Sequence, residues 1–136
     1  MSAVRNTHSP NHQFGVTVRE VFEVEKPSEK ITYLPFEKKV HNKFLLWHGV
    51  RACSAFATLR EGIRLPSVES NVGLMFGRGI YLTDCFSKAA NVAQQGQECG
   101  VVFLAEAALG EMHRAYEPNQ MTNGVPMYCH SVYGVG

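Results

Sequence analysis

The sequence predicts a single α+β domain, in which strands and helices follow one another along 136 residues. Two apolar runs, Leu45–Trp47 and Val101–Leu109, are typical of buried strands because neither has a polar face. Two other segments, Ser54–Glu61 and residues 86–93, repeat apolar residues at helical spacing. The predicted order is therefore strand, turn, strand, helix, strand, helix, strand.

The N-terminal region is expected to contain a loop and then a strand. Residues 1–13 are polar and lack periodicity, which predicts a loop. His8 and His12 are spaced as a helical metal pair would be, but Pro10 between them argues against a continuous helix. Residues 15–25 alternate between apolar and polar side chains, which predicts a half-buried strand.

The next segment is predicted to be irregular up to the first apolar run. Residues 26–30 are typical of a turn, and Pro35 should interrupt any long element between residues 31 and 40. Phe36 is expected to be a core anchor. The run Leu45–Trp47 is too apolar for an exposed strand and is placed centrally in the sheet.

The second half begins with the helix Ser54–Glu61, which Gly62 is placed to end. Residues 66–71 are expected to form a surface loop, and residues 80–82 a strand. A second helix should begin near Asp84, whose carboxylate can cap the first turn. Its small-residue face should pack closely on the sheet; this face contains Phe86, Ala89, Ala90 and Ala93.

Composition excludes several classes of function. A net charge of +1 provides no polycationic surface, so we expect no direct nucleic-acid binding by this chain. No apolar run approaches the roughly 20 residues that span a membrane, and the N-terminus lacks the layout of a secretory signal. The cysteines are widely spaced without a close pair, which predicts an intracellular protein with reduced thiols and no metal site; they are Cys53, Cys85, Cys99 and Cys129.

One stretch carries the features of a ligand pocket. His48 and Gly49 follow the apolar strand directly, and a glycine-rich loop containing Gly77 and Gly79 leads to Tyr81. Glycines allow backbone amides to approach a ligand without an intervening Cβ. A histidine and a tyrosine beside such amides suit hydroxyls and a flat ring, which indicates a nucleotide-like ligand.

Ordered sequence blocks make this indication more specific. They are Leu-Leu-Trp-His-Gly at 45–49, Gly-Ile-Arg at 62–64, Met-Phe-Gly-Arg-Gly-Ile-Tyr at 75–81, Ser-Lys-x-Ala-Asn at 87–91, Leu-Gly-Glu-Met at 109–112 and His-Ser-Val-Tyr-Gly-Val-Gly at 130–136. From about Asn6 onward, the chain resembles the catalytic domain of the poly(ADP-ribose) polymerase family, the diphtheria-toxin-like ADP-ribosyltransferases. The resemblance implies a split, mostly antiparallel β-sheet, incomplete at the C-terminus. It also implies a nuclear transferase that cleaves the nicotinamide–ribose bond of NAD+ and passes ADP-ribose to a protein acceptor, a glycosyl transfer through an oxocarbenium-like transition state.

The resemblance also implies roles for individual residues. His48 would bond the adenosine-side ribose, and Gly49 would hold the nicotinamide amide through its backbone. Tyr81 would pack against the nicotinamide end and, with His48, belong to the catalytic set. Arg64 would hold the adenosine and diphosphate side. Two further NAD+-binding positions are Gly79, in the glycine-rich loop, and Lys88, beside the family's catalytic glutamate.

Several positions depart from the family pattern. Ala89 stands where many members have a serine, Val92 where they have a second tyrosine, and Val50 where a small polar residue is common. Each change removes a contact of about 0.5–1.5 kcal/mol. The resemblance places the catalytic glutamate on a strand beyond residue 136, and neither Glu106 nor Glu111 aligns with it.

Residues 1–136 are therefore expected to form the donor-binding portion of the domain, weak or inactive alone. The alternatives are a module that binds NAD+ or ADP-ribose without turnover, and a truncated gene product. On the second alternative the chain would fold poorly and have no independent activity.

Overall fold

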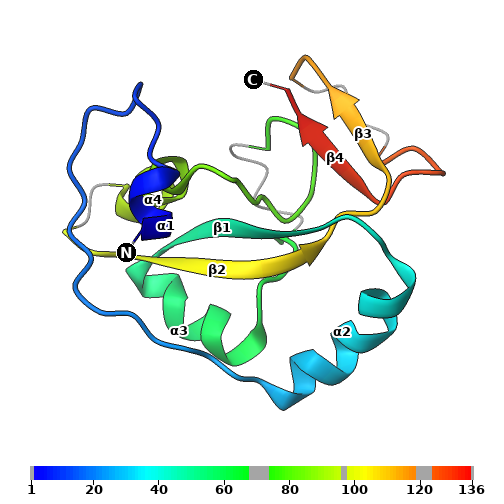
Figure 1. The fold of residues 1–136 in the computed structure, drawn as a ribbon, viewed down its shortest axis with the longest axis horizontal. Coiled ribbons are helices and arrows are strands. Elements are labelled where there is room, and N and C mark those ends of the chain that lie inside the picture. The colour runs from blue at the N-terminus through cyan, green and yellow to red at the C-terminus, as the bar shows by residue number, and fades with distance from the viewer. Residues whose placement is uncertain (1, 68–73, 96–97, 119–123, 136) are drawn as a thin grey trace.

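A computed structural model describes residues 2–67, 74–95, 98–118 and 124–135. Its helices are α1 (Ser2–Asn6), α2 (Pro27–Lys39), α3 (Ala52–Glu61) and α4 (Phe86–Gln94), and its strands are β1 (Lys43–Arg51), β2 (Gly100–Ala108), β3 (Met112–Ala115) and β4 (Ser131–Gly134). In Figure 1, α1 and α4 lie above the β1–β2 ribbon, and α2 and α3 lie below it. The mixture of helices with an antiparallel pair of long strands confirms the α+β class.

The β1–β2 ribbon is the centre of the fold. The two strands are antiparallel, with His48 opposite Phe103. On the other edge of β1, Trp47 exchanges backbone hydrogen bonds of 2.7 and 2.9 Å with Thr83. Since β1 has neighbours on both edges there, its predicted central position is confirmed. The strand predicted from the second apolar run is also confirmed, because β2 forms there. Leu45 is nevertheless 64% exposed, so the full burial expected for the first run is wrong.

The buried core lies between this ribbon and α4. Trp47 and Phe86 meet edge to face, with ring centroids 5.1 Å apart. Ala89 and Ala90 complete the cluster, each almost fully buried. The prediction of a small-residue face on this helix is confirmed, because alanines let the helix backbone approach β1. The predicted cap is wrong: Cys85 precedes the first residue of α4, and no side chain caps the helix.

The second strand pair differs from the expected sheet. β3 and β4 are parallel, with Met112 opposite Ser131. The segment before β4 returns to the start of β3, where the amide of His130 donates to the carbonyl of Glu111 at 2.8 Å. The described strands thus form two separate pairs: the longer one, β1–β2, is antiparallel as expected, and the shorter one, β3–β4, is parallel.

The N-terminal expectations are wrong in both segments. Residues 2–6 form α1 instead of a loop, and residues 15–25 form no strand. Val16 packs against the core cluster, but Phe22 and Val24 are 77% and 52% exposed, so only the start of the alternating pattern faces the core. Alternation makes a strand only where a neighbouring strand pairs with it, and no strand within the described part of the chain pairs with residues 15–25.

Helix α2 replaces the predicted turn and irregular segment. Pro27 occupies the first turn, where its missing N–H has no helical partner to lose. Pro35 lies within the helix and does not end it. Phe36 is 56% exposed and is therefore not a core anchor. The helix is tied to the ribbon elsewhere: the Tyr33 hydroxyl donates to Glu106 Oε1 at 2.9 Å.

Of the remaining local predictions, some are confirmed and others are wrong. Helix α3 forms and ends as predicted, because Gly62 adopts a φ of 87° and donates its amide to the Thr58 carbonyl. Residues 80–82 make no strand; one isolated bridge forms at Thr83 instead. Of the predicted loop at 66–71, only residues 66 and 67 lie within the described part, and both are irregular.

Candidate functional site

His48 lies near the middle of β1, and its ring is tied to the segment that contains Tyr81. Its Nδ1 is 2.8 Å from the Tyr81 carbonyl oxygen. A carbonyl can only accept, so Nδ1 carries the proton in this contact and Nε2 is left as an acceptor. The structure therefore brings these two predicted residues together, and it leaves His48 suited to a ligand hydroxyl.

A hollow of about 480 Å³ opens beside His48. Its size is within the usual range for small-molecule sites. The other lining residues come from α3 and the segment that follows it: Ser54, Ala57, Thr58, Glu61, Gly62, Ile63, Arg64, Leu65, Pro66 and Ser67. The hollow thus places His48 and Arg64, which are widely separated in sequence, around one space.

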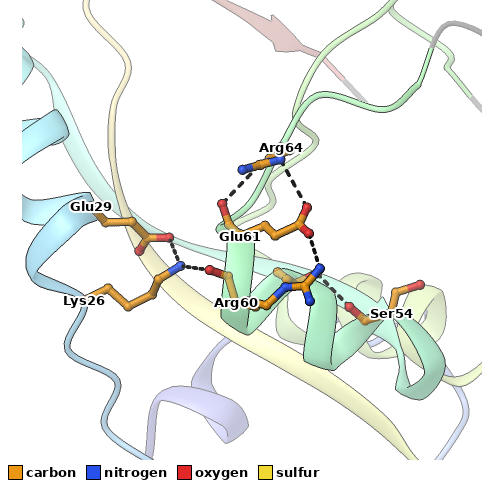
Figure 2. A network of polar contacts seen from close by, with 7 residues as sticks. Lys26, Glu29, Ser54, Arg60, Glu61 and Arg64 are labelled. Carbon is orange, nitrogen blue, oxygen red and sulfur yellow. Dashed lines mark hydrogen bonds and ion pairs between the residues drawn. The ribbon is translucent and has the colours of Figure 1, made fainter.

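Arg64 is held at this hollow by the end of α3. Its Nε donates to the Glu61 carbonyl and its Nη1 to the Glu61 carboxylate, both at 3.1 Å. The same carboxylate accepts from Arg60 Nη2 at 2.6 Å (Figure 2). The hydrogen bond from Arg60 and the charge of Arg64 lower the pKa of Glu61, which stays ionised at neutral pH.

Gly49 lies under α4 and does not line the hollow. A Cβ at this position would be 1.9 Å from the carbonyl oxygen of Ala89, and that oxygen belongs to rigid helix backbone. Close packing is therefore a sufficient structural reason for glycine here. Gly79 is different, because a Cβ there would meet no atom within 4 Å. Its surroundings are open, as a ligand-facing backbone position requires.

Tyr81 organises the glycine-rich loop through its hydroxyl. The hydroxyl accepts from the Phe76 amide at 2.9 Å and donates to the Gly77 carbonyl at 2.8 Å. The loop therefore uses the polar end of this side chain. The residue is 38% exposed. Tyr81 can offer a ligand its ring, while its hydroxyl holds the loop.

The other predicted positions lie on α4, away from the lining of the hollow. Lys88 is exposed on the first turn. Ala89, at the family's serine position, is 2% exposed, whereas Val92 is 46% exposed. Of these two departures from the family pattern, only the one at Val92 lies on an accessible surface.

Two features escaped the sequence-based reasoning. The first is Glu61, whose only signal in the sequence was its place three residues before Arg64. The second is a structural role for His12: its Nδ1 is 2.7 Å from the hydroxyl of Ser87, which is fully buried. The Ser9 amide donates to the same hydroxyl at 2.9 Å. Among the described residues, no group of three His, Cys, Asp or Glu side chains is arranged to hold a metal ion.

Comparison with known proteins shows which family this chain resembles in sequence. The family model of the poly(ADP-ribose) polymerase catalytic domain matches residues 1–136. Poly [ADP-ribose] polymerase 1 of Xenopus laevis is 41% identical over 98% of this chain and 14% of its own length. Poly [ADP-ribose] polymerase 1 of Gallus gallus is 39% identical over 98% of this chain and 13% of its own length.

A further relative, poly [ADP-ribose] polymerase 2 of Homo sapiens, is 37% identical over 98% of this chain and 23% of its own length. The chain thus spans less than a quarter of each of these relatives. No helix among the described residues is long and apolar enough to cross a membrane. With nearly the whole chain aligned to these relatives, this protein belongs to the poly(ADP-ribose) polymerase family, and its residues match the family's catalytic domain.

Proposed function

We propose that this chain is the donor-binding portion of an NAD+-dependent ADP-ribosyltransferase with the split-sheet fold of its family. The observation that carries the proposal is the hollow shared by His48 and Arg64. His48 Nε2 is an acceptor for a ribose hydroxyl, and Arg64 supplies N–H donors and a positive charge for a diphosphate. These two groups match the adenosine half of NAD+.

The nicotinamide half would bind beyond His48, toward Tyr81 and the open backbone at Gly79. The exposed part of the Tyr81 ring offers an apolar surface for a flat ring. His48 links the two halves through its contact with the Tyr81 carbonyl. Cleavage of the nicotinamide–ribose bond then depends on holding the ribose still while positive charge develops on it. A protein acceptor and a nuclear location are part of this proposal.

Binding without turnover is the second candidate, and the positions of two carboxylates favour it. Glu106 accepts from Tyr33, and Glu111 lies 3.2 Å from His41 Nε2. Neither lines the hollow. Neither is placed to orient a ribose bound beside His48. On this second candidate, the 136 residues would hold NAD+ or ADP-ribose without releasing nicotinamide.

Incubation with NAD+ labelled in the nicotinamide ring separates the two candidates. We expect calorimetry to show NAD+ binding by the 136-residue chain. Release of labelled nicotinamide above the buffer rate would support the transferase, and binding without release would support the module. Absence of binding would contradict both.

Replacement of His48 tests the site itself. His48→Ala removes the ribose acceptor and should weaken NAD+ binding by about 1 kcal/mol, roughly fivefold. His41→Ala is the matched control, because His41 is exposed and lies outside the hollow. Equal affinities for wild type and His48→Ala would contradict the assignment.

A further inference from the structure

The polar network at the end of α3 carries an inference that rests on the proposed function. Arg64 makes two contacts with one residue, through the Glu61 carbonyl and the Glu61 carboxylate. Its side chain is 67% exposed, so packing restrains it little. A free arginine side chain of this kind samples many rotamers, and ordering it on binding costs conformational entropy. We propose that Glu61 is a positioning residue that holds Arg64 in the hollow and thereby sets the preference of the site for ligands with a diphosphate.

The chain direction around Glu61 makes this contact possible. Helix α3 ends at Glu61, and Gly62 follows with a φ of 87°, so the chain leaves the helix before it reaches Arg64. Lys26 pins that turn by donating to the Arg60 carbonyl at 3.1 Å, while it pairs with Glu29 at 2.8 Å (Figure 2). The end of α3 is therefore held by the residue that precedes α2 as well as by its own hydrogen bonds.

The charges of the network decide between attraction and repulsion of an anion. Two guanidinium groups, Arg60 and Arg64, flank the single carboxylate of Glu61, so the three side chains keep a net positive charge. A guanidinium has about five N–H donors, and Glu61 uses only part of those of Arg64. Charges at this exposed site are also screened by salt. We therefore expect the positioning effect of Glu61 to outweigh its repulsion of a diphosphate.

Two ligands allow the two halves of the site to be tested separately. ADP-ribose contains the diphosphate and adenosine, whereas benzamide mimics nicotinamide alone. We expect Glu61→Ala to weaken ADP-ribose binding about 3- to 10-fold and to change benzamide binding less than about twofold. Glu61→Gln keeps an acceptor for Arg64 and should recover most of the loss. Glu23→Ala is the control for an exposed glutamate outside the network, and it should bind both ligands as wild type does.

A double-mutant cycle shows whether Glu61 acts through Arg64. Glu61→Ala should cause no further loss of ADP-ribose affinity in an Arg64→Ala background. Equal or tighter ADP-ribose binding by Glu61→Ala, or the same loss with and without Arg64, would overturn the inference. Glu61→Ser, whose side chain is too short to reach Arg64, provides the same reading if Glu61→Ala does not fold.

The failure of the inference is distinguishable from failure of the proposed function. If Arg64→Ala weakens ADP-ribose binding and Glu61→Ala does not, only the positioning role is overturned. If wild type fails to bind ADP-ribose, or Arg64→Ala binds it as wild type does, the hollow is not the adenosine site and both proposals fall.

Discussion

The two sides of β1 are built on opposite physical principles. On one side α4 packs against the strand through glycine and alanine, and Ala89 and Ala93 are 2% and 1% exposed. On the other side α3 borders an open hollow with exposed charged groups. His48 and Gly49 are adjacent in sequence yet belong to different sides. Gly49 serves packing, so its replacement should test folding, whereas replacement of His48 should test binding.

The largest effect is expected for Gly49→Ala. The new Cβ would collide with the Ala89 carbonyl oxygen 1.9 Å away, and relief requires movement of helix backbone. Overpacking of this kind costs about 1–3 kcal/mol or more, and urea denaturation should show a loss at the upper end of that range. Gly79→Ala is the control, because its site is open, and it should change stability by less than about 0.5 kcal/mol. Similar losses for both variants would break the comparison.

Smaller effects are expected at Ala89 and Val92, the two positions on α4 that depart from the family pattern. One substitution should change binding and the other stability. Val92→Tyr adds an aromatic face at an exposed position and should tighten benzamide binding by about 0.5–1.5 kcal/mol without loss of stability. Ala89→Ser places a hydroxyl at a buried position and should lower stability by about 1 kcal/mol. Calorimetry and urea denaturation of the single and double variants check both. Unchanged benzamide affinity in a folded double variant would show that residue 92 does not face the ligand.

Tyr81→Phe should have a local effect. It removes the hydroxyl that bonds Phe76 and Gly77 but keeps the ring and the carbonyl that holds His48. We expect faster hydrogen exchange at the Phe76 amide and a stability loss of about 1 kcal/mol. Tyr128→Phe is the control, since Tyr128 is 85% exposed. Unaltered exchange at Phe76 would show that the loop keeps its shape without the hydroxyl.

The smallest effect concerns Cys85, before α4. Burial raises the pKa of this thiol, but hydrogen bonds from the Ser87 side chain and from the backbone of Lys88, Ser9 and Ser87 lower it by more. Because the folded pKa lies below the unfolded value, the stabilisation is present above the unfolded pKa and is lost as pH falls through the folded pKa.

Alkylation by iodoacetamide, followed at Cys85 by peptide mass spectrometry, measures the titration of this thiol separately from the exposed Cys53 and Cys99. Its midpoint should lie below the ordinary value of about 8.5 and should rise in Ser87→Ala. A midpoint that does not move in a folded Ser87→Ala variant would contradict the role of this hydroxyl. Loss of structure in that variant would be visible by circular dichroism.

Predictions from sequence succeeded where short-range patterns decide the structure. Helix α3 ends at Gly62 because its periodicity and its terminating glycine are both local features. Strand β2 forms from a long apolar run that contains one charged residue, Glu106. The alternation of residues 15–25 and the core assignment of Phe36 failed because each depends on a distant neighbour that the pattern does not contain.

The sequence by itself determined the α+β class, the family and the residues around which a donor site is expected. It did so because apolar runs, helical spacing and ordered blocks are properties of the chain alone. The tertiary structure decided which of those residues share a space. It brought His48 and Arg64 to one hollow and placed Gly49 under Ala89. These contacts depend on how β1, α3 and α4 pack, and packing joins residues that no local pattern connects.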